Sequence, residues 1–388
     1  MVLPNSSVAR TKRSAPLSVA VVGAGWSGVT AARVLHDAGC RVHLFEQDVV
    51  VGGHSRAGNI NGVLTEPEGP HIFHTSDRGV LDFVRRFGMT GESAHKGLTE
   101  VFLDDADEEP YLLSWPPQVD ELKNLPIWSK VEKELSALPK HPATQNLETY
   151  CISIMGKTLY ELFIEGYTTK QWDKHPAELS SEFAPRRLEL RTDGYRRLFR
   201  DTWEFFPPGG AQVVMENIAA SIPATFGASI TVDDLEDLEK DYQVLILTAP
   251  LDVFLGRPNE LEWRGIRTVS RYIPLDDPNG TVTPGYIVNQ PSLRRPYTRT
   301  VESKHISGQS QLGTVVSEEY PGAPARHYPV PTVGMRHERR NLELQQEIQN
   351  RTGMEVHFCG RLANYTYINQ DEAVAQAFAC AQLVLQGS

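Results

Sequence analysis

The chain has 388 residues, 40% of them hydrophobic, so it can bury a large core, and its length is typical of two or three domains. Its formal net charge of −11 argues against nucleic acid as a partner, because a phosphate backbone is bound by a basic face. The four widely spaced cysteines indicate neither a disulfide framework nor a zinc site and are typical of a cytoplasmic protein. No apolar run is long enough to predict a membrane span.

Residues 1–16 contain basic residues but no apolar signal segment, so we expect a flexible tail. From residue 17 the chain predicts a βαβ unit. The apolar run 17–22 is typical of a buried parallel strand, a helix is expected to about Ala38, and "RVHLFE" (41–46) is expected to form a second strand.

Glycines at the first strand–helix turn predict a dinucleotide site. Gly23, Gly25 and Gly28 form G-x-G-x-x-G, in which the first allows a tight turn, the second lets a pyrophosphate approach the backbone, and the third lets helix and strand pack closely. The start of the helix adds unpaired N–H groups and a positive dipole end. Glu46 ends the second strand, where a carboxylate can accept hydrogen bonds from ribose hydroxyls and disfavours a 2′-phosphate.

Two further segments favour FAD as the dinucleotide. The doublet Gly52-Gly53 follows the second strand and leaves room for a second close approach of the backbone, although such a doublet is also a common turn. Near the end of the chain, a strand (356–359), a polar and aromatic loop and a helix from Asp371 can return to the first βαβ unit. The late helix would then face the ring end of the cofactor.

The fold class predicted is α/β, with a Rossmann-like FAD-binding domain, an inserted helical domain and an antiparallel β-sheet domain. The middle of the chain is mostly helical in pattern, and a later Pro-rich, β-branched region (263–335) is typical of antiparallel strands. The expected domains are residues 17–95, 207–256 and 350–388 for FAD, 118–182 for the helices, and 96–117, 183–206 and 257–349 for a substrate-binding sheet.

The segment "GYTTKQW" and two arginine clusters are the other candidates for a site. Tyr167 and Trp172 could clamp a flat polar ligand, but at this spacing alone core packing is favoured. The clusters at 186–200 and 294–299 could bind an anion or could be solvated basic faces.

Taken together, the motifs resemble the bacterial UDP-galactopyranose mutase family, in order and at similar spacing over nearly the whole chain. The resemblance implies a flavoenzyme that interconverts pyranose and furanose forms of a nucleotide sugar, with N5 of reduced FAD forming an adduct at the anomeric carbon. It also implies NAD(P)H or another reductant and a homodimer. The matching motifs are "GPHIFHTSD" (69–77), "ISIMGKTLYELFIEGYTTKQW" (152–172), "FPPGGAQVV" (206–214), "PYTRTVESKH" (296–305), "VVSEEYP" (315–321), "HYPV" (327–330) and "GRLANYTY" (360–367).

The resemblance also implies roles for individual residues. Arg299, with Arg186 second, would stabilise the departing diphosphate; Arg187 or Arg191 could replace Arg186 if the alignment shifts. Tyr167 would stack on the base, with Trp172 beside the sugar and diphosphate. The remaining residues implied for the substrate are Asn289, Glu319, Tyr328 and Tyr367, and those for the flavin are Gly53, His54, His71, His74, Gly360, Arg361 and Asn369.

A carbonyl at His74 could accept a hydrogen bond from the reduced flavin. A metal held by His71 and His74 is disfavoured, because residues three apart on an extended segment face opposite sides and no third ligand is evident.

The sequence departs from the family at residues 195–204, where a diphosphate-binding tyrosine is missing or replaced by Tyr195. Asn369 stands where the family usually has aspartate, and His54 is a further difference. These changes suggest a related nucleotide sugar, although UDP-galactose is the first expectation. Two alternatives stay open: an oxidase or desaturase of the amine-oxidase type, and a flavoprotein that binds sugar nucleotides without isomerising them.

Overall fold

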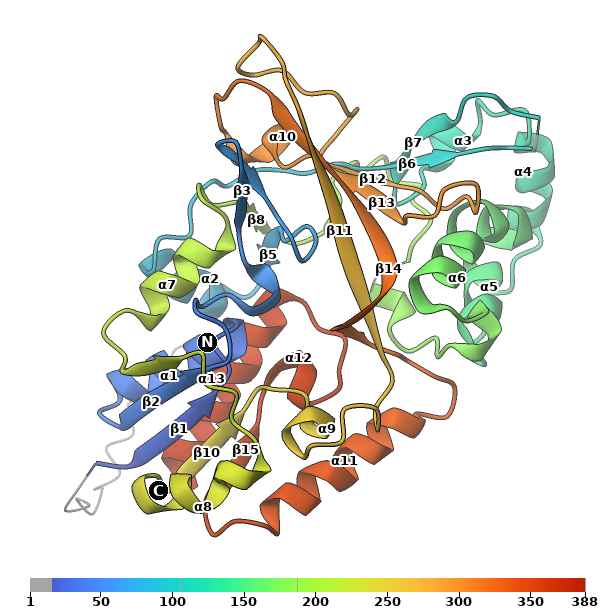
Figure 1. Cartoon of the computed structure of the whole chain (residues 1–388). Coiled ribbons are helices and arrows are strands. Elements are labelled where there is room, and N and C mark those ends of the chain that lie inside the picture. The colour runs from blue at the N-terminus through green and yellow to red at the C-terminus, as the bar shows by residue number, and fades with distance from the viewer. Residues whose placement is uncertain (1–15, 105, 187, 388) are drawn as a thin grey trace.

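A computed structural model of the chain describes residues 16–104, 106–186 and 188–387. It contains a parallel sheet, a long and strongly twisted second sheet, and a group of helices beyond that second sheet (Figure 1). Among the described residues, no helix is long and apolar enough to cross a membrane.

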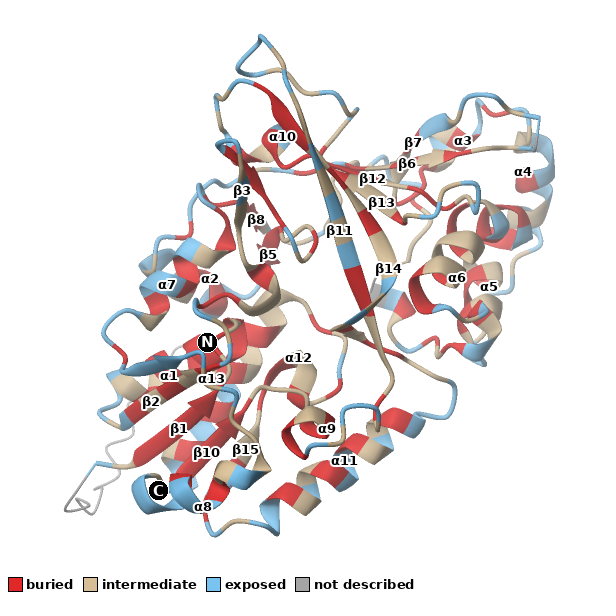
Figure 2. Cartoon of the chain, viewed as in Figure 1, coloured by how far each residue is buried: buried red, intermediate tan, exposed pale blue. Residues whose placement is uncertain are grey.

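The parallel sheet has the strand order β15-β10-β1-β2-β9, and every neighbouring pair in it is parallel. Its central strands β1 and β10 are buried because helices cover both faces, as Figure 2 shows, whereas the edge strand β9 is exposed. Along β1, Val19 and Val21 join one core cluster while Ala20 and Val22 join another. The five strands are β1 (Ser18–Val22), β2 (Arg41–Glu46), β9 (Ala224–Phe226), β10 (Val244–Leu247) and β15 (Glu355–Phe358).

The helices over the two faces come from the beginning, the middle and the end of the chain. One face is covered by α1 (Trp26–Asp37), α2 (Arg78–Arg86), α7 (Ala211–Ala219) and α13 (Gln370–Gly387). The other is covered by α8 (Leu235–Asp241), α9 (Leu251–Phe254), α11 (Arg336–Gln349) and α12 (Gly360–Ala363). The expected Rossmann-like fold is confirmed, but α12 lies where only a loop was expected, because four residues are too few to show helical periodicity.

The second sheet has the order β11-β14-β13-β12-β6-β7. All its neighbours are antiparallel except β12 and β6, which pair in parallel, so the expectation of a purely antiparallel sheet is corrected at this point. The strands are β6 (Gly97–Val101), β7 (Tyr111–Trp115), β11 (Trp263–Ile273), β12 (Ile287–Asn289), β13 (Arg299–Val301) and β14 (Thr314–Pro329).

The helical group packs against the end of this sheet and forms its own core. Asn146 begins its longest helix with a capping box, in which its side chain accepts from the Thr149 N–H. Asp173 ends the last helix in a left-handed conformation, with φ of 54°. The elements are α3 (Val119–Leu122), α4 (Trp128–Ser136), α5 (Leu147–Tyr160), the π-helical turn η2 (Glu161–Glu165), α6 (Gly166–Trp172) and the short turns η3 (Pro176–Glu178) and η4 (Ala184–Arg186).

Short elements connect the two sheets. The pairs β3 (Gly58–Ile60) with β4 (Val63–Thr65) and β5 (Phe73–Thr75) with β8 (Trp203–Phe205) are two-stranded and antiparallel. The remaining elements are η1 (Gly53–Ser55), η5 (Val232–Asp234) and α10 (Lys304–Ser307). The pairing of β5 with β8 matters for function, because it brings the segment after Arg191 against His74.

Candidate active site

Two cavities meet in the middle of the molecule. The first, here called the glycine groove, has a volume of about 510 Å³ and lies along the turn after β1 and the end of β2. The second, the central cleft, has a volume of about 760 Å³ and lies between the second sheet and the helical group. Both are lined by His71, Arg361, Asn369 and Gln370, so a ligand in one can touch a ligand in the other.

The three fingerprint glycines lie in the turn between β1 and α1 and in the first turn of α1. Gly23 has φ of +102° in the tight turn, and a Cβ on Gly28 would lie 1.8 Å from the Gly23 carbonyl oxygen. Gly25 lines the groove opposite Gly53, where a Cβ on Gly53 would lie 3.2 Å from the Gly25 Cα. Side chains at Gly25 and Gly53 would therefore narrow the groove between two bare stretches of backbone.

Glu46 lines the glycine groove at the end of β2. Its carboxylate accepts hydrogen bonds from the backbone N–H groups of Ala24 (2.6 Å) and Asp48 (2.9 Å), and burial raises its pKa. Each of these oxygens has a second lone pair, so the carboxylate can also accept from a ribose hydroxyl.

The groove fits a dinucleotide such as FAD. The first turn of α1 has no side-chain cap at Gly25, which leaves N–H groups for a phosphate. Where the groove meets the cleft, the Nδ1 atom of His71 is buried without a hydrogen-bond partner among the described residues. Burial, aided by Arg361 and Arg299, lowers the His71 pKa to about 3, so the ring is neutral at physiological pH. Gly360 and Arg361, at the start of α12, line the far side of the groove.

His54 also lines the glycine groove and belongs to a network of polar residues. Its ring stacks on His327 at 4.5 Å, and burial beside His327 and Arg361 holds the pKa of His54 well below its ordinary value. The Ile266 N–H donates to Nδ1 of His327 (3.1 Å), while Nε2 of His327 lies 2.8 Å from the Glu68 carboxylate. The hydrogen bond from His327, with a second one from Arg56, lowers the Glu68 pKa to about 2.

We expect the substitution Glu68→Gln to reduce the acid sensitivity of the fold. Because its folded pKa lies below the ordinary 4.5, ionised Glu68 stabilises the protein above about pH 4.5, and this contribution is lost as the pH falls toward 2. The difference in unfolding free energy between wild type and variant should be about 1.4 kcal/mol smaller at roughly pH 3.5 than at about pH 6. Urea unfolding at both pH values measures it. Glu92→Gln, which breaks an exposed pair with Arg85, is the control, and a pH-independent difference for Glu68→Gln would contradict the expectation.

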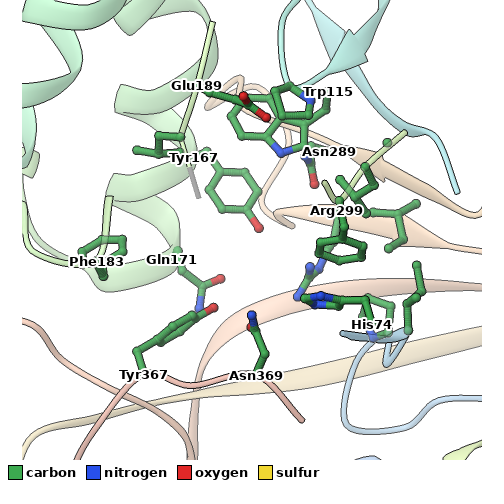
Figure 3. A pocket seen from close by; sticks show the side chains of 18 of the residues that line it. His74, Trp115, Tyr167, Gln171, Phe183, Glu189, Asn289, Arg299, Tyr367 and Asn369 are labelled. Carbon is green, nitrogen blue, oxygen red and sulfur yellow. The ribbon is translucent and has the colours of Figure 1, made fainter. Parts of the chain in front are cut away.

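Arg299 lies in the wall of the central cleft on β13. Its Nε donates to the fully buried carboxylate of Glu319 on β14, and its Nη2 lies 3.4 Å from the Tyr328 hydroxyl. On the other side, β12 places Asn289 directly opposite Arg299 in the sheet register. Figure 3 shows the Tyr167 hydroxyl, the Asn289 amide and the Arg299 guanidinium directed into the same space.

An aromatic cluster lines the cleft beside Arg299. Tyr328 and Tyr367 stack at 5.4 Å, and the edge of Trp172 meets both rings. The Arg361 guanidinium lies 5.5 Å from the first ring and 5.2 Å from the second. Burial raises the pKa of Tyr328, so this hydroxyl stays protonated and can donate to an anion.

Tyr167 and Trp172 occupy different environments although both line the cleft. Tyr167 is half-buried and directs its ring into the cleft from α6 (Figure 3). Trp172 is only 6% exposed and packs in the core of the helical group, so it forms a wall rather than a free platform. Trp172 can therefore pack in the core and also present part of its surface to a ligand in the cleft.

His74 is buried at the cleft on β5. Its Nδ1 lies 2.7 Å from the Asp201 carboxylate, and its ring stacks on Phe199 at 3.7 Å. The hydrogen bond to His74 lowers the pKa of Asp201. Phe199 and Asp201 belong to the stretch that departs from the family pattern, and nothing in the sequence indicated this contact.

The structure describes only part of the arginine cluster at 186–200. The backbone of Arg186 ends η4, but its side chain and all of Arg187 lie outside what the structure describes. Arg191 is 2% exposed and its guanidinium binds Glu189 and the carbonyls of Tyr195, Arg197 and Leu198, so it braces this loop.

Tyr195 is not placed to replace the missing tyrosine. Its hydroxyl donates to the Phe199 carbonyl (2.9 Å), and it is not among the described residues that line the cleft.

Residues in the lining that the sequence did not single out include Trp115, Gln171, Phe183, Glu189 and Asp371. Of these residues, only Gln171 could have been found from the sequence, because it lies inside the candidate segment "GYTTKQW". The described residues contain no group of three or more His, Cys, Asp or Glu side chains that could hold a metal ion.

Several known proteins are similar to this chain over nearly its whole length. A "Probable UDP-galactopyranose mutase" of Klebsiella pneumoniae is 27% identical over 380 residues (94% of each chain), and a "dTDP-fucopyranose mutase" of Escherichia coli is 25% identical over 386 residues (95% of this chain, 99% of that one). A crystal structure of reduced UDP-galactopyranose mutase superposes with a TM-score of 0.75 at 19% identity, covering 96% of each chain.

Two family models match parts of the chain. One, described as an NAD(P)-binding Rossmann-like domain, matches residues 21–87, which contain the glycine fingerprint and Glu46. The other, described as UDP-galactopyranose mutase, matches residues 162–367, which contain Tyr167, Arg299 and Tyr367. Since the second match spans more than half of the chain, this protein belongs to the UDP-galactopyranose mutase family.

Proposed function

We propose that the protein is an FAD-dependent mutase that interconverts the pyranose and furanose forms of a nucleotide sugar. UDP-galactose is the first candidate, and a related sugar nucleotide, as the name of the dTDP-fucopyranose relative suggests, is the second. The observation that carries the proposal is the position of Arg299 and the tyrosine pair in a cleft that opens onto the glycine groove.

The roles proposed for the chain follow from charge and geometry. Cleaving the bond between the sugar and the nucleoside diphosphate builds negative charge on the departing phosphate. Arg299, held by Glu319, and the protonated Tyr328 supply donors for that charge without having to reorganise. Tyr167, whose ring enters the cleft from α6, offers a ring for the base.

FAD in the glycine groove, once reduced, would supply the nucleophile that replaces the diphosphate on the sugar. The chain would bind it through the Gly25–Gly53 passage, Glu46 and Arg361. The pairing of β5 with β8, and the His74–Asp201 contact, fix the backbone at His74 where the reactive end of the flavin is proposed to lie. A homodimer and NAD(P)H as the reductant stay predictions from the family resemblance, and a cytoplasmic location stays a prediction from the cysteine usage.

The test is turnover of a panel of nucleotide sugars by protein loaded with FAD, before and after reduction with dithionite, with ring forms separated by chromatography. We expect a furanose product from at least one UDP- or dTDP-sugar, only after reduction. Equal turnover by oxidised protein would contradict the proposal. Peroxide release with an amine and no response to nucleotide sugars would instead identify an oxidase, and tight binding without isomerisation would identify a binding protein.

A further inference from the structure

Lys170 connects two parts of the central cleft without lining it. It lies on α6 between Tyr167 and Trp172, and its side chain reaches the loop of residues 290–298, here called the Arg299 loop, which joins β12 to β13. Its ammonium donates to four backbone carbonyls of that loop: Gln290 (2.5 Å), Ser292 (2.8 Å), Arg295 (3.0 Å) and Tyr297 (2.8 Å).

Carbonyl groups spread along this loop converge on the one ammonium. The loop's own backbone contributes few hydrogen bonds, chiefly Gln290 N–H to Thr298 O (2.8 Å) and Arg295 N–H to Ser292 O (3.3 Å). Four carbonyl oxygens around one point repel one another unless a cation lies between them. An ammonium has three N–H donors, so Lys170 shares them among four acceptors, and no neutral side chain of similar length can replace it.

Two further contacts fix α6 at the same place. A Cβ on Gly166 would lie 2.4 Å from the Pro291 carbonyl oxygen, so the helix and the loop touch through bare backbone. At the other end of α6, the Arg264 guanidinium from β11 donates to the carbonyls of Gln171 (2.9 Å) and Lys170 (3.3 Å). The helix that carries Tyr167 is therefore held to the sheet at its end and to the loop at its middle.

We propose that Lys170 is a positioning residue that sets the separation between the base-binding end of the cleft at Tyr167 and the diphosphate-binding end at Arg299. It acts through the Arg299 loop, which leads directly into Arg299. The assignment of the two ends rests on the proposed function. A nucleoside diphosphate must touch both ends at once, so its affinity depends on their spacing, whereas a ligand of either end alone does not sense it.

The experiment compares Lys170→Met with wild type in the oxidised, FAD-loaded protein, by titration calorimetry with UDP, uridine and pyrophosphate; dTDP and thymidine replace UDP and uridine if wild type does not bind UDP. We expect the Kd for UDP to rise about tenfold or more, and the Kd values for uridine and for pyrophosphate to change less than about threefold. In reduced protein, KM should rise with the UDP Kd while kcat changes less. Binding to oxidised protein does not require turnover, so it is tested even if the proposed reaction fails.

Lys304→Met is the matched control. Lys304 is buried, 6% exposed, and donates to two backbone carbonyls, those of Gln311 and Gly313 (both 2.7 Å), but it lines neither cavity. It should lower thermal stability as Lys170→Met does and leave the Kd for UDP within about twofold. If Lys170→Met does not fold, Lys170→Arg, whose planar guanidinium cannot fit four converging carbonyls, is expected to show the same selective loss of UDP affinity.

Three outcomes would overturn the inference. One is an unchanged UDP affinity in a folded Lys170 variant. Another is an equal loss for uridine and UDP, which would mean that Lys170 only supports the helix under Tyr167. The third is a wild-type protein that binds neither UDP nor dTDP, since the two ends of the cleft would then not be assigned correctly.

Discussion

Replacing Arg299 with lysine is expected to lower kcat/KM for the nucleotide sugar by roughly 100-fold or more. The guanidinium uses its Nε for Glu319 and presents its remaining donors beside the Tyr328 hydroxyl, and a lysine cannot bind both sides in this planar arrangement. The loss should fall on kcat as well as on UDP affinity, because the charge on the leaving phosphate is greatest in the transition state.

Two measurements separate this effect from damage to the fold. Lysine keeps a positive charge next to the buried Glu319, so the melting temperature should fall much less than in Arg299→Ala, which leaves that carboxylate unpaired. Arg351→Lys is the matched control, because Arg351 is exposed, pairs with Glu347 and lines neither cavity. Arg299→Lys with kcat/KM near that of wild type would exclude Arg299 from the proposed role.

The parts of the fold that could be predicted are those with local signals. The apolar run that forms β1, the three glycines and the acidic end of β2 together predict a strand, a turn and a helix that the structure shows. The parallel pairing of β12 with β6 could not be predicted, because the two strands are far apart in the sequence and each is short. The residue pattern within a strand does not indicate which other strand will pair with it.

The residues of the candidate site also fall into those that local motifs predict and those that depend on distant contacts. Arg299, Tyr328 and Tyr367 were singled out through motifs, and the structure brings them to one cleft. The stacking of Phe199 on His74 was not foreseen, because it depends on β5 pairing with β8 across more than a hundred residues of chain. The four carbonyls around Lys170 were equally invisible, since backbone acceptors have no sequence signature.

Gly28→Ala should have the largest effect on cofactor binding, for a reason that involves only backbone atoms. The added Cβ would lie 1.8 Å from the Gly23 carbonyl oxygen and 2.9 Å from the Gly23 carbonyl carbon, and neither can rotate away as a side chain could. The start of α1 must therefore move away from β1. This disrupts the turn at Gly23 and the N–H groups proposed to bind the pyrophosphate.

We expect the purified Gly28→Ala protein to lack flavin absorbance and to lose about 3 kcal/mol of unfolding free energy or more, since overpacking a rigid site forces the backbone to shift. Gly353→Ala is the control, because a Cβ there meets no atom within 4 Å. Flavin content and urea unfolding measure the two effects. Full FAD content and wild-type stability in Gly28→Ala would contradict the expectation. The start of α1 would then not be in close contact with the turn after β1, and the proposed pyrophosphate site would be wrong.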